Sequence, residues 1–500
     1  NYGYMEQYWP YGDASLSLQN PYWIQNRINR TSNKKRYMMN ASLKWQATDW
    51  LNVVGRVNLD NSDYRNKNEK SASTLTTFCG VSGGFEDAMR QERSLYADFL
   101  ANIDKTFGDF HLTANVGASI YHTSMDQLYI AGDLVIPNFF QINNINFSAN
   151  YKPDPTGYED EIQSIFAIAE LRWKYRLCLT VTGRNDWDSK LASSTQKSFF
   201  YPSVGLSALL SEMVKLPEVI SYAKIRGSYT VVASSFDRFL TNPGYEYNSQ
   251  THNWANPTVY PMDNMKPEKT KSWEIGLNLK FWGNRFNLDA TYYRSNTLNQ
   301  TFKVDIPSSS GYKQAIVQAG NVQNQGIELA LGFSDKWAGF GWSSNATFTL
   351  NRNKVKRLAS GSVNPVTGEA IQMDEMNVGW LGKENVAPRV ILTEGGSMTD
   401  IYVYNQLTKD NNGNIKVDQN GNLGITSSNT PVKVGNLDAD FNLGWTNHFT
   451  YKGIDLGVVL SARVGGLAYS ATQGILDYYG VSETSATARD NGGIPINNGK

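Results

Sequence analysis

The side chains that most often carry catalysis are few in this 500-residue chain and poorly placed for it. None of its four histidines is at ligand spacing from another, and no His-Glu-x-x-His or Cys-x-x-Cys motif is present. Asp186 and Asp188 are the nearest approach to a paired acid and base, but neighbouring acids at a strand end are usually solvated. We therefore expect no enzyme activity and no catalytic residue.

Two short repeats rich in oxygen ligands are the strongest candidate for a metal site. Residues 410–414 (DNNGN) are echoed by residues 418–422 (DQNGN), and oxygen-rich loops can take calcium, here through Asp410, Asn412 and Asn414. Asn-Gly is also the strongest signal for a tight turn, because both central residues need positive φ. We favour the turn, keep calcium as the alternative, and predict no other cofactor.

A third segment mixes aromatic rings with amides. Rings stack on sugar faces or on peptide side chains, and amides hydrogen-bond hydroxyl or backbone groups. The alternative is a loop packed by its own rings. The candidate substrate-binding residues are Tyr245, Tyr247, Asn248, Trp254, Asn256 and Tyr260.

A recurring hairpin must position these segments. Each of about seven copies has two stretches in which apolar and polar residues alternate, as expected for strands with two different faces. A very short turn with aromatic residues beside it joins the two stretches. The turns fall near residues 48–50, 107–110, 173–175, 281–284, 337–340 and 449–452, with a less regular one at 211–221.

Much longer polar segments separate the hairpins, and short and long connections alternate strictly. This pattern, with aromatics at the strand ends, is typical of an antiparallel transmembrane β-barrel whose long loops face outward. Soluble β-sandwiches and propellers are the alternatives. We predict an all-β fold in which residues 1–500, with about fourteen strands, form part of one barrel domain. The expected long loops lie near residues 65–93, 122–160, 231–269, 295–324, 354–436 and 467–500.

The composition agrees with a barrel. Basic and acidic side chains number 46 each, so the chain lacks the excess of positive charge that a general nucleic-acid binder needs. No apolar run reaches the roughly 18 residues of a membrane helix. A mean hydropathy of -0.44 suits a barrel, because only alternate residues face lipid. The 28 Tyr, 21 Phe and 13 Trp suit a membrane–water boundary.

Several segments resemble motifs of the SusC/RagA-type TonB-dependent transporters. Residues 266–276 (KPEKTKSWEIG) look like a barrel segment of that family, and residues 321–328 (NVQNQGIE) resemble one of its strand entries. Residues 184–189 (RNDWDS) and 201–229 are similar to two further stretches. We interpret Gly326, in residues 321–328, as a position that relieves backbone crowding rather than one that binds a ligand.

The resemblance implies a 22-stranded, plugged barrel in the outer membrane of a Gram-negative cell, in contact with its lipid. It further implies active import driven by TonB through an N-terminal segment, a SusD-like surface lipoprotein as partner, and a dimer of such pairs. The cargo would be an oligosaccharide, which we favour, or a peptide. A passive porin is the alternative function. We expect this chain to be a section of such a barrel, without its plug or final strands.

Overall fold

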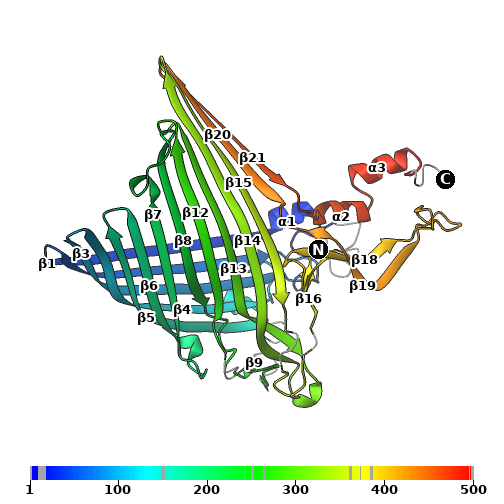
Figure 1. The fold of residues 1–500 in the computed structure, drawn as a ribbon. Helices are drawn as coiled ribbons and strands as arrows, with labels where there is room; N and C mark the ends of the chain where they lie inside the picture. The colour runs from blue at the N-terminus through cyan, green and yellow to red at the C-terminus, as the bar shows by residue number, and fades with distance from the viewer. Residues whose placement is uncertain are drawn as a thin grey trace.

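The computed structural model describes residues 3–8, 19–147, 152–241, 244–248, 253–262, 265–359, 363–371, 373–382, 387–494 and 496. Its main feature is one sheet of fifteen strands, antiparallel except for β11, bent into a deep open wall (Figure 1). The strands follow one another along the sheet nearly in chain order. β1 and β21 form its two ends, and β11 joins from the side by pairing with β14. The predicted all-β barrel sheet is confirmed.

The strands of this sheet are long. Their bounds are β1 Ile28–Thr48, β2 Leu51–Lys70, β3 Gly84–Phe107, β4 Phe110–Asp133, β5 Lys152–Trp173, β6 Leu177–Asp188, β7 Ser198–Leu209, β8 Ile220–Ser234, β11 Val259–Tyr260, β12 Glu268–Phe281, β13 Phe286–Asp305, β14 Gln314–Trp337, β15 Phe340–Arg357, β20 Phe441–Tyr451 and β21 Ile454–Val464.

All seven predicted short turns lie between consecutive strands. Lys174 and Tyr175, between β5 and β6, have φ values of 47° and 57°, and Gly108, between β3 and β4, has a φ of 58°. Such left-handed turns match the twist of paired strands, which explains why connections this short suffice. The less regular connection contains the 3-10 turn η3 (Leu210–Glu212) between β7 and β8.

Several strands run further than the pattern alone predicts. The connection expected at 65–93 is shortened to residues 71–83, because β2 continues to Lys70 and β3 begins at Gly84. The stretch expected at 295–324 likewise reduces to residues 306–313. These strand ends have polar residues on both faces, so apolar and polar residues do not alternate there and the sequence pattern does not reveal them. Beyond the membrane, neither face of a strand needs to be apolar.

The two faces of the sheet differ in chemistry. Cross-strand register places Leu43, Gly55, Phe99, Ala118 and Ile165 in one row on the same face. On β2 this apolar face runs from Leu51 to Leu59, about nine residues, or roughly 23 Å across a bilayer for a strand tilted by about 40°. That height matches the apolar band of an outer-membrane barrel.

Aromatic rings gather at the short-turn end of the sheet. Phe281 and Phe286 stack with their planes 5° apart, and Trp337 stacks on Phe340 across the next hairpin. Phe333 contacts Trp342 with ring centroids 4.9 Å apart. This belt lies where the aromatic girdle of a transmembrane barrel meets the interface. Because barrels of this kind have short periplasmic turns and longer extracellular loops, we assign the short turns to the periplasmic side.

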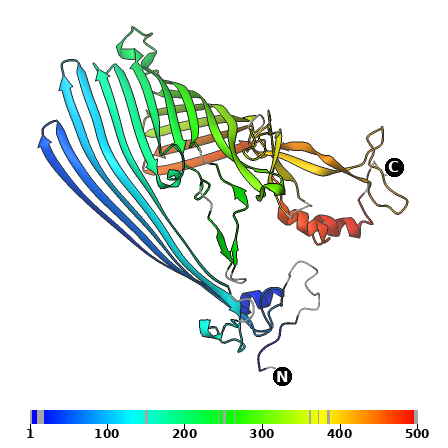
Figure 2. The same cartoon turned by 90° about the horizontal axis from the view of Figure 1, so that it is seen from below.

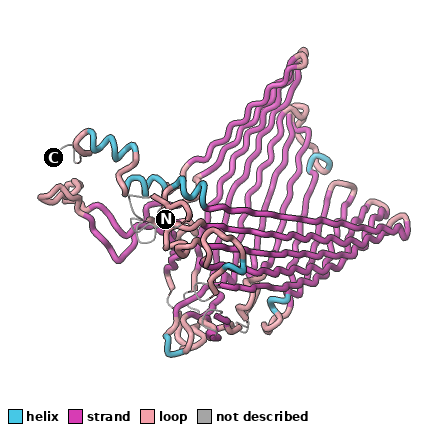
Figure 3. The backbone as a smooth tube through the Cα atoms, turned by 180° about the vertical axis from the view of Figure 1, so that it is seen from behind, coloured by secondary structure: helices cyan, strands magenta, loops and turns pink. Residues whose placement is uncertain are grey.

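Smaller elements gather at the long-loop end (Figures 1 and 2). One is a four-stranded sheet in the order β16-β17-β18-β19, and another is a two-stranded hairpin, β9-β10. Figure 3 shows the α-helices beside this end of the wall. The smaller strands are β9 Glu246–Asn248, β10 Asn253–Ala255, β16 Glu375–Trp380, β17 Arg389–Thr393, β18 Asp400–Leu407 and β19 Ile425–Asn436. The α-helices are α1 Pro21–Arg27, α2 Ala471–Tyr478 and α3 Glu483–Asp490, and the 3-10 turns are η1 Ile142–Asn144, η2 Ser189–Leu191 and η4 Ser308–Ser310.

Buried hydrophobic clusters occur at this outer end rather than within the wall. One contains Leu191, Phe199, Phe236, Met265 and Ile316, and a larger one lies around Val304, Val317 and Val355. They fix the loops on the strand ends. No helix in the described part of the chain is long and apolar enough to cross a membrane.

Candidate functional site

Several charged side chains on the polar face of the sheet are paired with one another. Arg56 on β2 donates two hydrogen bonds to Asp98 on β3, at 2.9 and 2.6 Å, and the Tyr96 hydroxyl donates to the same carboxylate at 2.9 Å. The Asp98 side chain is fully buried. Register places Ser42, Arg56, Asp98, Ser119 and Ser164 in one cross-strand row. This face is therefore a hydrogen-bonded wall.

Two further clusters continue the same face. Arg184 on β6 donates to Asp186 at 2.7 Å and to Ser164 at 2.8 Å, and the Tyr201 hydroxyl donates to the other oxygen of Asp186. Arg226 on β8 pairs with Asp289 on β13 at 2.9 Å. The sequence alone does not indicate these pairs, because the partners depend on the register between strands.

Removing Asp98 tests the value of these pairs. In Asp98→Ala, Arg56 and Tyr96 lose their shared acceptor, but Arg56 is 44% exposed, so water replaces much of the lost interaction. We expect a loss of about 1 kcal/mol in the free energy of unfolding, measured by urea titration in detergent. Asp104→Ala on the same strand is the control, because the Asp104 side chain is 68% exposed. Equal free energies of unfolding for the two variants would show that the pairs of Asp98 with Arg56 and Tyr96 do not stabilise the sheet.

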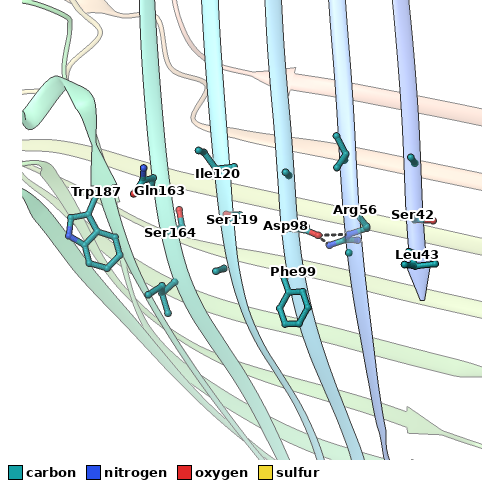
Figure 4. Close-up of a pocket in the computed structure, with 16 residues that line it drawn as sticks. Ser42, Leu43, Arg56, Asp98, Phe99, Ser119, Ile120, Gln163, Ser164 and Trp187 are labelled. Carbon is teal, nitrogen blue, oxygen red and sulfur yellow. Dashed lines mark hydrogen bonds and ion pairs between the residues drawn. The ribbon is translucent and has the colours of Figure 1, made fainter. Parts of the chain in front are cut away.

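A hollow of about 1000 Å³ crosses β1 to β6 on the opposite, apolar face. Figure 4 shows Leu43, Phe99 and Ile120 around it, with the Arg56–Asp98 pair beside them. Small residues such as Ala41 make its floor shallow. Because this face lies at the level of the apolar band, we assign the hollow to contact with acyl chains rather than to cargo.

The predicted aromatic segment divides into two parts. Tyr247 on β9 and Trp254 on β10 face each other with ring centroids 5.1 Å apart, and their side chains are 51% and 67% exposed. Tyr245 and Asn256 are exposed beside this hairpin, and Asn248 lies in β9. The structure thus brings these candidates to one two-stranded element, which we call the aromatic hairpin (residues 245–248 and 253–256).

Tyr260 takes a different position. It lies in β11, and its ring packs edge-on against Tyr312 at a centroid distance of 5.2 Å, beside a buried cluster. The loop-packing alternative therefore describes Tyr260, whereas Tyr245, Tyr247 and Trp254 offer ring surface to a ligand. Whether any of these residues binds cargo stays a prediction.

The two repeats at residues 410–414 and 418–422 form similar turns. The Asp410 carboxylate accepts hydrogen bonds from the backbone N–H groups of Asn412 and Asn414, both at 2.8 Å, and from the Asn414 side chain at 3.2 Å. Asp418 has the corresponding partners in Asn420 and Asn422. Hydrogen bonds from Asn414 lower the pKa of Asp410, and hydrogen bonds from Asn422 lower the pKa of Asp418. Gly413 and Gly421 have φ values of 83° and 81°, as the turn requires.

We expect calcium to leave these turns unaffected. N–H donors already point at the carboxylate oxygens that a cation would need, and among described residues no group of three His, Cys, Asp or Glu side chains is arranged to hold a metal. The melting temperature of the protein should therefore be the same in millimolar calcium and in a chelator. A calcium-dependent rise that Asp410→Asn abolishes would establish the site instead.

Comparison with known proteins identifies the class of the fold. The family model for the TonB dependent receptor-like β-barrel matches residues 1–383, so the chain belongs to this family of outer-membrane proteins. It is 23% identical over 425 residues to TonB-dependent receptor P3 of Formosa agariphila, covering 79% of this chain and 41% of that protein. It is 25% identical over 340 residues to TonB-dependent receptor SusC of Bacteroides thetaiotaomicron, covering 63% of this chain and 33% of SusC.

A solved structure agrees with this fold. The open-open state of the RagAB peptide importer superimposes with a TM-score of 0.75 at 16% identity, covering 92% of this chain and 50% of that one. The predicted resemblance to SusC/RagA-type proteins and the outer-membrane location are thereby confirmed. The chain spans half or less of the length of each of these relatives.

Proposed function

We propose that the full transporter containing this chain actively imports a nutrient across the outer membrane, energised through TonB. The observation that carries the proposal is the two-faced wall, with an apolar band on one side and a paired, hydrogen-bonded polar face on the other. A closed wall of this kind encloses a hydrated passage. Membership in the TonB-dependent family favours energised import over a passive porin.

An oligosaccharide is the favoured cargo. The aromatic hairpin offers exposed faces of Tyr247 and Trp254, and flat rings stack well against sugar rings. A peptide is the alternative, and one structural neighbour is named as a peptide importer. We further propose that a SusD-like lipoprotein acts with the transporter at the long-loop end, and that two such pairs associate.

Growth of a deletion strain tests this function. A strain lacking the full-length gene should fail to grow on at least one glycan as sole carbon source, and the wild-type gene should restore growth. A tonB-null strain should share the defect, because import needs energy. If the deletion strain grew on every glycan but failed to grow on peptides, the cargo would be a peptide. Growth of the tonB-null strain on the affected glycan would point to a passive porin.

Trp254→Ala is the corresponding test within the chain. Loss of a stacking ring should weaken cargo binding by about tenfold, measured by calorimetry on the full transporter in detergent. Trp282→Ala is the matched control, because Trp282 is also exposed, at 58%, but lies in the periplasmic turn between β12 and β13. Equal affinity in the two variants would remove the aromatic hairpin from the binding site.

A further inference from the structure

A cavity of about 230 Å³, lined mainly by charged and hydroxyl-bearing residues, lies where the chain beyond β8 meets the outer part of β5. Its walls come from three segments, namely the outer part of β5, the turn at 189–193 and residues 238–241. The last segment begins the same long connection that carries the aromatic hairpin. The cavity thus lies at the base of the candidate cargo-binding loop, at the outer end of the wall.

An ion pair holds the two sides of the cavity together. Arg238 Nε donates to Asp160 Oδ2 at 2.5 Å, and its guanidinium lies 3.4 Å from the centre of the Tyr158 ring. The Asp160 side chain is only 11% exposed. Because the two residues are 78 positions apart in sequence, this contact fixes the loop on β5.

Two buried side chains anchor the walls from below. Leu191, in the turn, and Phe236, before Arg238, belong to the same hydrophobic cluster. The Ser194 hydroxyl donates to the backbone oxygen of Met265 at 3.0 Å within this cluster. The cavity is therefore formed before any ligand arrives, which lowers the entropic cost of binding.

One wall residue indicates that the cavity takes a ligand. Phe239, on the cavity wall, is 66% exposed and has a φ of 63°. A left-handed, exposed phenylalanine is strained without any gain in core packing.

We propose that this cavity is a subsite for one neutral sugar ring of the imported glycan, an inference that rests on the proposed function. Its volume lies below the roughly 300–1,000 Å³ of pockets that take drug-sized ligands, so it suits a single ring. The Phe239 ring supplies a stacking face, and Ser189, Lys190 and Thr241 supply hydrogen-bonding groups.

The charge of the cavity favours a neutral ring over a sulfated or uronic one. Glu159 and Asp160 are balanced by Lys190 and Arg238, so the cavity has no excess positive charge for an anion. Arg238 is already bound to Asp160, and the Lys190 ammonium donates to the Ser235 hydroxyl at 3.3 Å. An anionic sugar would have to break these contacts or remain unpaired.

Calorimetry on the full-length transporter in detergent tests the subsite, with neutral hexasaccharides of glucose, xylose and mannose as probes. Phe239→Ala should weaken binding of the tightest-binding hexasaccharide by about tenfold, because it removes the stacking ring. The alanine must still adopt the same left-handed backbone conformation. Phe239→Trp should keep the affinity within about twofold. Phe78→Ala is the control, because Phe78 is an exposed ring on a different loop. A sulfated form of the best probe should bind more weakly than its neutral parent.

The possible outcomes distinguish a failure of the subsite proposal from a failure of the proposed function. If the wild type binds a hexasaccharide and Phe239→Ala binds it equally well, the subsite is wrong and the proposed import of glycan stands. If the wild type binds peptides and none of the hexasaccharides, both the subsite and the glycan cargo fail. A sulfated probe that binds more tightly than its neutral parent would overturn the neutral-sugar assignment.

Discussion

Replacing Gly326 by valine is expected to prevent the barrel from assembling. Gly326 lies within β14, where the neighbouring strand passes very close. A Cβ atom built on it would lie 2.2 Å from the carbonyl oxygen of Leu350 and 2.6 Å from the Tyr293 hydroxyl oxygen. The hydroxyl can swing away, but the carbonyl belongs to the β15 backbone, so the strands would have to separate. We expect a loss of at least about 4 kcal/mol in the free energy of unfolding.

The measurement is the fraction of full-length protein that migrates as folded, heat-modifiable barrel on gels of outer-membrane extracts. Gly55→Val is the matched control, because a Cβ at Gly55 meets nothing within 4 Å and faces the apolar side of β2. The control should assemble as well as the wild type. Normal assembly of Gly326→Val would show that β14 and β15 do not pair in the register described here.

Replacing Val116 by arginine is the second change with a large expected effect. Val116 is at the middle of the apolar face of β4, and its side chain is 48% exposed. If that face contacts acyl chains, an arginine near the bilayer midplane should cost about 2–4 kcal/mol. Unfolding by urea in lipid vesicles measures this loss, compared with the wild-type transporter.

The neighbouring position provides the control. Asn115 lies on the opposite, polar face and pairs in register with Asn102 on β3. Asn115→Arg places the same charge in a hydrated passage, so its cost should stay within about 1 kcal/mol. If Asn115→Arg proved as costly as Val116→Arg, the assignment of the two faces would be wrong.

The sequence predicted the wall because its determinants are local. Period-two alternation and tight turns are set by residues a few positions apart, as in the hairpin of β3 and β4 around Gly108. Gly326 was also interpreted correctly as a position of backbone crowding. The four-stranded sheet of β16 to β19, within the long loop expected at 354–436, was not anticipated. Its strands are short, and bulges such as the one between Asn377 and Gly379 interrupt the alternation.

The site was less predictable because its contacts are distant in sequence. The Asp160–Arg238 pair depends on how a loop folds back on the wall, and Arg56–Asp98 depends on strand register. A segment rich in rings was enough to indicate the aromatic hairpin. The same composition could not separate Tyr260, which packs against Tyr312, from the exposed Tyr247.

The most direct test of the two-faced wall is a spin-label scan along β4 of the full-length transporter in lipid vesicles. Single cysteines at positions 112 to 120, in a background without Cys79 and Cys178, are labelled and measured for collisions with oxygen and with a water-soluble nickel complex. Oxygen collisions should be highest at the even positions, and nickel collisions at the odd positions. Equal accessibility along the strand, or the opposite alternation, would contradict a membrane-spanning wall with acyl chains on one face and water on the other.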